Sequence, residues 1–196
     1  MEDAPIWKCL LKCSVKDVYD CLVENNDLLK CLDKWSKEPS TLIDTKITFD
    51  NVFKTANDTC LWWFQYRLLY KLLPTGRFLY LRKLVDSPIC SLCNQVEETL
   101  SHMLWDCPKI QDYWFDIQGW LHANFSHCSK ILFSREFIIL ENKVNTVTDR
   151  IFVLFMLIAK YHVFTSRLQG TTLHLNIFIQ KLKSRFSAEK YNYTVN

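Results

Sequence analysis

Apolar residues recur at helical spacing along most of the chain, and polar turns separate the segments. In the first third, apolar residues between Val15 and Leu22 lie three or four positions apart, behind a capping-box pattern that begins at Ser14. A shorter helix is expected after Thr48. The pattern therefore predicts helices in this part of the chain.

A core helix is predicted over residues 60–73. This segment is apolar on nearly every face, which is typical of a helix that other elements surround. Three good cap residues at 57–59 favour its start, and Pro74 ends it. Thr75 can then cap a second helix that runs to about Val85.

Another helix is predicted from Pro108, because proline suits the first turn of a helix. Its apolar stripe consists of Tyr113, Trp114, Ile117 and Leu121. Residues 129–145 show no clear period, although 131–133 and 137–140 have the composition of short strands. No element is assigned to that segment.

The rest of the chain predicts two long helices. The first begins near Thr148, ends near Gly170 and contains the longest apolar run, 151–159. That run is well short of the roughly 20 residues that a membrane-spanning helix needs, so a buried helix is expected. The stripe of the last helix is Leu175, Phe178, Ile179, Leu182 and Phe186, and Lys181, Lys183 and Arg185 lie away from it. We expect one face of this helix to dock and the other to be basic.

The net charge of +3 hides an uneven distribution of charge along the chain. Residues 60–85 hold five basic side chains and none acidic, residues 160–196 hold six basic and one acidic, and residues 86–118 reverse to six acidic and one basic. An anion-binding surface is therefore expected from the first two of these segments. The candidate nucleic-acid contacts are Arg67, Lys71, Arg77, Arg82 and Lys83. Arg67 and Lys71 would share a helix face, and charge alone equally fits a solvated polar stripe there.

Three cysteines and a histidine are spaced as the ligands of one metal ion: Cys90, Cys93, His102 and Cys107. Cysteines separated by two residues place both sulfurs on the same ion across a tight turn. Thr99 can cap a short helix that carries His102. In a continuous α-helix, five residues would rotate Cys107 by about 140° from His102, so the helix must end or bend before Cys107. Pro108 accounts for that break.

Three thiolates and one neutral imidazole predict a closed, net-negative Zn²⁺ site with no open position for water or substrate. Such a site is structural rather than catalytic and holds one ion. Its binding can supply on the order of 10 kcal/mol, comparable to the stability of a whole domain, so metal and local fold should be lost together. The alternative is a chance spacing in a cysteine-rich chain, and the turn, cap and proline signals argue against it.

The other thiols and histidines carry less weight. Cys9, Cys13, Cys21, Cys31, Cys60 and Cys128 are interpreted as small hydrophobic residues. His122, His127 and Cys128 form at most a partial second site, because a fourth ligand is lacking nearby. His162 and His174 are interpreted as packed or surface histidines.

These observations predict a mainly α fold: a helical domain with room for one short hairpin and with an embedded zinc knuckle, in which two cysteines, a histidine and a third cysteine follow in that order. Only three glycines are present, and β-sandwiches and barrels need more for their tight turns. The expected division is an N-terminal helical segment (1–59), core helices with the knuckle (60–128) and a C-terminal helical segment (129–196). The first five residues lack the features of a signal peptide, and the nine cysteines have no regular framework. An intracellular location is expected, without a choice between nucleus and cytoplasm.

Several stretches are similar to one known family: Trp63 to Arg67, Leu73 to Gly76, the knuckle with Glu98, Thr99, Pro108 and Trp114, and the tail around Leu157 to Tyr161 and Phe178 to Tyr191. They resemble the zinc-binding region that follows the polymerase in non-LTR retrotransposons, closest to the LINE elements of vertebrates. The ligand positions of that family fall on Cys90, Cys93, His102 and Cys107.

The resemblance implies a module that helps a reverse transcriptase to hold template RNA or target DNA. The rest of the polyprotein would be its protein partner, and neither a membrane nor a small-molecule substrate is expected. The sequence contains no Asp-Asp pair and no motif of clustered carboxylates for two-metal phosphoryl transfer. We therefore expect no polymerase or endonuclease activity. The alternatives are a zinc-stapled scaffold fragment and a non-functional relic of a retroelement.

Overall fold

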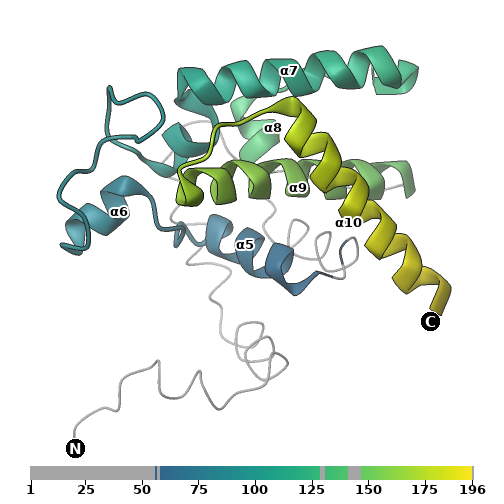
Figure 1. Cartoon of the computed structure of the whole chain (residues 1–196), viewed down its shortest axis with the longest axis horizontal. Coiled ribbons are helices and arrows are strands. Elements are labelled where there is room, and N and C mark those ends of the chain that lie inside the picture. The colour runs from purple at the N-terminus through teal and green to yellow at the C-terminus, as the bar shows by residue number, and fades with distance from the viewer. Residues whose placement is uncertain (1–55, 57, 129–130, 141–146, 196) are drawn as a thin grey trace, which may run out of the picture. The chain divides into compact units, whose positions relative to one another are not determined.

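A computed structural model describes Ala56 and residues 58–128, 131–140 and 147–195, all within one compact unit, Ile47–Asn196. The helices predicted in the first third, and Cys9 to Cys31, lie outside the described residues. The elements are α5 (Thr59–Leu69), α6 (Gly76–Leu81), the π-helical turn η1 (His102–Asp106), α7 (Pro108–Asn124), the 3-10 turn η2 (Ser126–Cys128), α8 (Arg135–Leu140), α9 (Val147–Gln169) and α10 (Leu175–Val195) (Figure 1). No strand forms within the described ranges, so the prediction of a mainly α fold is confirmed. The three-segment division stays a prediction.

Helix α5 starts where the cap residues predict but ends at Leu69 rather than Leu73. The Asp58 carboxylate accepts a hydrogen bond of 2.8 Å from the Cys60 N–H at the start. At the other end Lys71 has a left-handed φ of 54°, and the Leu72 N–H donates to the Arg67 carbonyl at 2.7 Å, which closes the helix. Lys71 thus lies beyond the helix, and the prediction that it shares a helix face with Arg67 is wrong.

Helix α6 is shorter than predicted for the same reason. The Thr75 hydroxyl accepts from the Phe78 N–H at 3.2 Å, which confirms the predicted cap. The helix then ends at Leu81 instead of near Val85, because Lys83 has a left-handed φ of 57°.

Helix α7 matches the prediction, and α8 lies in the segment to which the sequence assigned no element. All four stripe residues predicted on α7 are buried, together with Ile110. Residues 137–140, considered as a strand, belong to α8, and 131–133 form no regular element. The Ser134 hydroxyl accepts from the Phe137 N–H at 3.2 Å, so a local cap favours the helix over the strand composition of the segment.

Helix α9 is the buried helix that the apolar run predicts, and it ends at Gln169, just before Gly170, whose φ is 63°. Ile151–Gln169 is long and apolar enough to cross a membrane by length and composition alone, but 67% of its most apolar stretch is buried inside the protein. The helix therefore lies as a core helix does, and no membrane span is implied.

The helices pack around α9, which contacts α5, α10 and η1 (Figure 1). Helix α10 crosses α9 and also contacts α7. Phe178 is fully buried there, with its ring centroid 5.4 Å from that of Phe155 and 6.1 Å from that of Tyr113. The docking face predicted for α10 is thus confirmed. Its basic face is only partly free, because Arg185 pairs with Asp58.

Candidate metal centre

A hairpin-like loop presents the first two cysteines. The Glu98 N–H donates to the Pro88 carbonyl and the Cys90 N–H to the Val96 carbonyl, both at 2.8 Å, so the two arms of the loop pair. Only an isolated antiparallel bridge results, and neither arm is a strand. Asn94 closes the turn in a left-handed conformation with a φ of 54°, which asparagine tolerates better than most residues. This tight turn directs the Cys90 and Cys93 sulfurs towards one point.

A π-helical turn presents the other two predicted ligands. The Thr99 hydroxyl accepts from the His102 N–H at 3.1 Å, which confirms the predicted cap. The Cys107 N–H then donates to the His102 carbonyl at 3.1 Å, five residues back. A turn closed over five residues is wider than an α-turn and brings the fifth residue back above the first. The predicted break before Cys107 is therefore confirmed: the helix changes to a π-helical turn and ends at Asp106.

The four predicted ligands form one cluster, in which all ligand atoms lie within 4.8 Å of one another. The Cys90 and Cys107 sulfurs are 4.0 Å apart, and the Cys93 sulfur is 3.4 Å from the His102 Nε2. Ligands of a tetrahedral zinc ion, at about 2.3 Å for sulfur and 2.0–2.1 Å for nitrogen, lie roughly 3.5–3.8 Å apart. The donor atoms therefore fit a single four-coordinate ion of this kind.

The thiols of the cluster differ in how readily they lose a proton when no cation is present. Burial raises the pKa of Cys107 to about 12, and the charge of Cys90 contributes to this rise. Burial likewise raises the pKa of Cys90. At Cys93 burial also acts upwards, but hydrogen bonds from the Gln95 backbone and the Cys90 side chain outweigh it and the pKa is lowered. Three thiolates at these distances repel one another, so only a cation between them can hold all three ionised near neutral pH.

A buried carboxylate next to the ligands ties the loop to the helices. The Glu98 carboxylate accepts from the Gly76 N–H at 2.7 Å and pairs with Arg167 of α9, with Nη2 and Oε1 2.5 Å apart. Arg167 also donates to the Pro74 carbonyl at 2.7 Å. This one ion pair thus joins the metal loop, the start of α6 and the end of α9. Sequence reasoning did not find this role, because a glutamate in an acidic segment normally predicts a solvated side chain.

The five candidate nucleic-acid contacts are separated by the structure into different environments. Arg67, Arg77, Arg82 and Lys83 are exposed, and Lys71 is half-buried. Arg77 pairs with Glu97 at 3.0 Å, and the Arg82 guanidinium lies 3.6 Å from the centroid of the Phe78 ring. Arg67 lies on α5 and Lys71 just after it, whereas Arg77, Arg82 and Lys83 lie on α6 or directly after it, so the five residues do not share one helix face.

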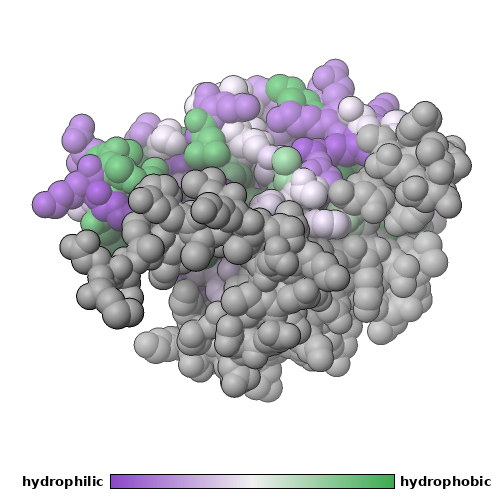
Figure 2. Space-filling view, turned by 90° about the horizontal axis from the view of Figure 1, so that it is seen from below, coloured by the Kyte–Doolittle hydropathy of each residue, from purple (hydrophilic) through white to green (hydrophobic). Residues whose placement is uncertain are grey.

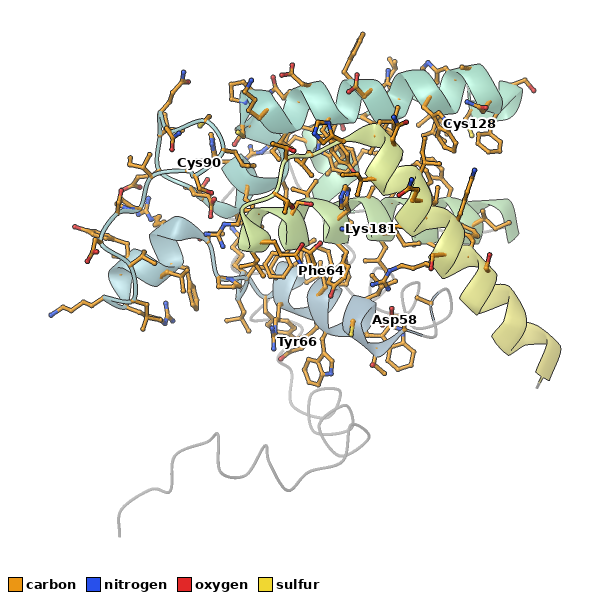
Figure 3. All side chains as sticks on the ribbon, viewed as in Figure 1. Asp58, Phe64, Tyr66, Cys90, Cys128 and Lys181 are labelled. Carbon is orange, nitrogen blue, oxygen red and sulfur yellow. The ribbon has the colours of Figure 1, made fainter. Side chains whose placement is uncertain are left out.

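The remaining cysteines and histidines do not form a second cluster within the described residues. His122 Nε2 lies 2.9 Å from the Ile131 carbonyl and Cys128 is buried, at the opposite end of α7 from Cys90 in Figure 3. His162 is packed, with Nδ1 2.9 Å from the Tyr113 hydroxyl, and His174 is exposed. Cys60 is exposed, whereas Cys128 has the burial of a small hydrophobic residue.

Fold and site together define a helical module that carries a candidate metal site of three cysteines and one histidine. A family model described as zinc-binding in reverse transcriptase matches residues 13–114, which include all four ligands. Because this match spans more than half of the 196 residues, the chain belongs to that family. No curated protein and no solved structure matches the chain. The family resemblance predicted from the sequence is thus confirmed, and the closer assignment to LINE elements stays a prediction.

Proposed function

We propose that the chain binds one structural Zn²⁺ ion and serves as a nucleic-acid-associated accessory module derived from the C-terminal region of a LINE-type reverse transcriptase polyprotein. The ligands are Cys90, Cys93, His102 and Cys107. A set of three thiolates and one imidazole suits Zn²⁺ better than Mg²⁺ or Ca²⁺, which prefer oxygen ligands. When bound, the ion supplies a cross-link between the loop and the start of α7, and all four of its positions are filled by protein.

The proposal is carried by the buried Glu98 carboxylate and its partners Gly76 and Arg167. We call this group the Glu98 bracket. Glu98 lies between Cys93 and His102 in the chain, and its carboxylate holds the Gly76 N–H, which is the start of α6. Helix α6 and the residues after it carry three of the candidate basic contacts. A folded metal loop therefore fixes the orientation of a basic surface. The net-negative centre itself would repel phosphate, so the contacts belong to its neighbours.

The same proposal assigns no polymerase or endonuclease activity to the chain. Its support is the sequence, which offers no clustered carboxylate motif for two-metal phosphoryl transfer. The ligand thiolates also favour an intracellular location, because reducing compartments keep such thiols available for metal. RNA or DNA is the proposed ligand and the remainder of the polyprotein the proposed protein partner.

Binding of a single-stranded RNA across a salt series tests the proposal. The wild-type chain should carry stoichiometric zinc and lose affinity as salt rises, with a slope that reflects several phosphate contacts. Cys93→Ser should lose zinc and binding together. Arg82→Ala combined with Lys83→Ala, on the surface that the bracket orients, should weaken binding and flatten the salt dependence while zinc content stays unchanged. Lys109→Ala is the matched control, because Lys109 is an exposed cation at the start of α7.

Two results would contradict the nucleic-acid part of the proposal. One is an absence of RNA and DNA binding at low salt by a zinc-loaded wild-type chain. The other is a binding constant that does not change with salt, since phosphate contacts release counterions.

An interaction scaffold is the second candidate function, and exposed apolar side chains favour it. Leu81 is 69% exposed and Leu84 is 66% exposed, next to Tyr80 and Val85, which are also exposed. In Figure 2 hydrophobic surface lies directly beside hydrophilic surface at the left, the end where Figure 1 places α6. Contiguous apolar surface of this kind marks protein interfaces. Sedimentation of the wild type and of Leu81→Ser/Leu84→Ser tests this function: self-association that the variant abolishes supports it, and a monomeric wild type argues against it.

A further inference from the structure

A small groove lies between α5 and α9, away from the metal centre. Its volume is about 300 Å³, and its walls are Cys60, Trp63, Phe64, Arg67, Leu73, Tyr161 and Phe164. The four residues from α5 are spaced by three or four positions, so they form one face of that helix. Tyr161 and Phe164 supply the opposite wall from α9. Two packed helices therefore supply all of the walls except Leu73, which comes from the segment after α5.

Aromatic rings form most of the groove. Phe64 is buried and points from α5 towards α9, whereas Tyr66 points away from it (Figure 3). The Phe64 ring centroid lies 5.5 Å from that of Tyr161 and 5.4 Å from that of Phe164, so three rings make a closed floor. Trp63 is 39% exposed and stands at the rim. The three rings of the floor pack against one another, whereas the Trp63 ring stays partly accessible to a ligand.

The groove carries a positive charge that nothing in the described part of the chain neutralises. The Arg67 guanidinium is exposed and has no hydrogen-bond or ion-pair partner among the described residues. No acidic side chain lines the groove. By contrast Arg77 and Arg185 are each paired with a carboxylate, Glu97 and Asp58. An occupant with a flat apolar part and a nearby negative charge would complement both features.

We propose that this groove binds one unpaired base of a single-stranded nucleic acid, with the base stacked on Trp63 and the adjacent phosphate on Arg67. This assignment rests on the proposed function and names the part of the surface that holds the strand. The volume is at the low end of the range for small-ligand sites, which suits one flat ring and is too small for a partner helix. Every base has a π-face, so recognition of this kind tolerates any sequence.

An octamer of deoxythymidine and an octamer of abasic deoxyribose phosphate provide the direct test. The two strands carry the same charge and differ only in their bases. Base stacking on one aromatic side chain should make the intact strand bind on the order of tenfold more tightly than the abasic one. Deoxythymidine monophosphate is a third probe. It should bind much more weakly than the octamer, because it has no neighbouring phosphates, and equal affinity would identify a free nucleotide as the ligand and overturn the proposal.

Variants then assign the effect to the groove. Trp63→Ala should abolish most of the preference for the intact strand, and Trp63→Phe should restore a large part of it. Arg67→Ala should weaken both strands and reduce the salt slope by about one. Phe115→Ala is the control for an aromatic side chain, because Phe115 is 78% exposed on α7 and outside the groove. Zinc content and the melting temperature should match the wild type in every variant used.

Cys60 offers an independent readout, since it is an exposed thiol in the wall of the groove. Alkylation of Cys60, measured by peptide mass spectrometry, should slow severalfold with the intact octamer and less with the abasic one. Equal binding of the two strands, or an unchanged preference in Trp63→Ala, overturns the groove assignment while nucleic-acid binding stands. If neither strand binds at low salt, both the groove and the proposed function fail.

Discussion

Two adjacent glutamates, each paired with an arginine, should differ strongly in their effect on stability. The Glu97 carboxylate lies 3.0 Å from Arg77, and both side chains are about half exposed, at 49% and 56%. The Glu98 carboxylate lies 2.5 Å from Arg167, and these side chains are only 1% and 10% exposed. We predict that Glu98→Ala is severely destabilising and that Glu97→Ala is nearly neutral.

The expected magnitudes follow from solvent exposure. An exposed ion pair contributes about 0–1 kcal/mol, because water and salt screen it. Removing one partner of a buried pair costs roughly 3–5 kcal/mol, since the other charge stays buried without a counterion. Glu98→Ala would leave the Arg167 guanidinium and the Gly76 N–H without their carboxylate. We therefore expect a difference of about 3 kcal/mol between the two variants.

Urea unfolding at saturating zinc measures this difference, with zinc content checked for each variant. Replacing Glu98 and Arg167 together with apolar residues, as in Glu98→Leu/Arg167→Met, should recover part of the lost stability, because no unpaired charge remains. Equal free energies of unfolding for Glu97→Ala and Glu98→Ala would refute the bracket as a structural anchor.

Three further changes test other parts of the fold by urea or thermal unfolding. Gly76→Ala should cost about 1–3 kcal/mol, because a Cβ atom there would meet the Pro88 carbonyl oxygen at 2.8 Å; an unchanged stability would contradict this contact. Trp114→Phe should cost about 2 kcal/mol through lost volume and the lost hydrogen bond of 2.8 Å from Trp114 Nε1 to the Leu104 carbonyl. Burial lowers the pKa of His162 from an ordinary 6.5 to about 4. The stability that the neutral His162 side chain contributes is therefore fully present above pH 6.5 and is lost as the pH falls towards 4. His162→Phe should reduce the loss of unfolding free energy at acid pH by up to about 3 kcal/mol relative to wild type. If the unfolding free energies of variant and wild type fall equally between pH 7 and pH 4.5, this role of His162 is refuted.

The cluster of three cysteines and one histidine and most of the described helices could be predicted because their signals are local. The spacing of Cys90 and Cys93, the cap at Thr99 and the proline after Cys107 each act over a few residues, and the structure forms the corresponding turns. Asp58 and Thr75 likewise cap the helices that they predict. Short-range rules of this kind depend little on the rest of the fold.

Features that depend on distant packing could not be predicted. The ends of α5 and α6 are set by left-handed Lys71 and Lys83, and lysine gives no signal for that conformation. Glu98 finds its partner at Arg167, 69 residues away, so an acidic segment that looks solvated hides a buried anchor. The π-turn that starts at His102 also has no sequence signature beyond the requirement that Cys107 return to the other three candidate ligands.

Native mass spectrometry of the purified chain tests the central claim most directly, which is that the four residues hold one zinc ion. We predict one zinc ion per wild-type chain, no retained zinc in Cys107→Ser, and one zinc ion in Cys128→Ser, a buried thiol outside the cluster. A wild-type chain without zinc, or a Cys107→Ser chain that keeps the ion as tightly as wild type against a chelator, would contradict the account.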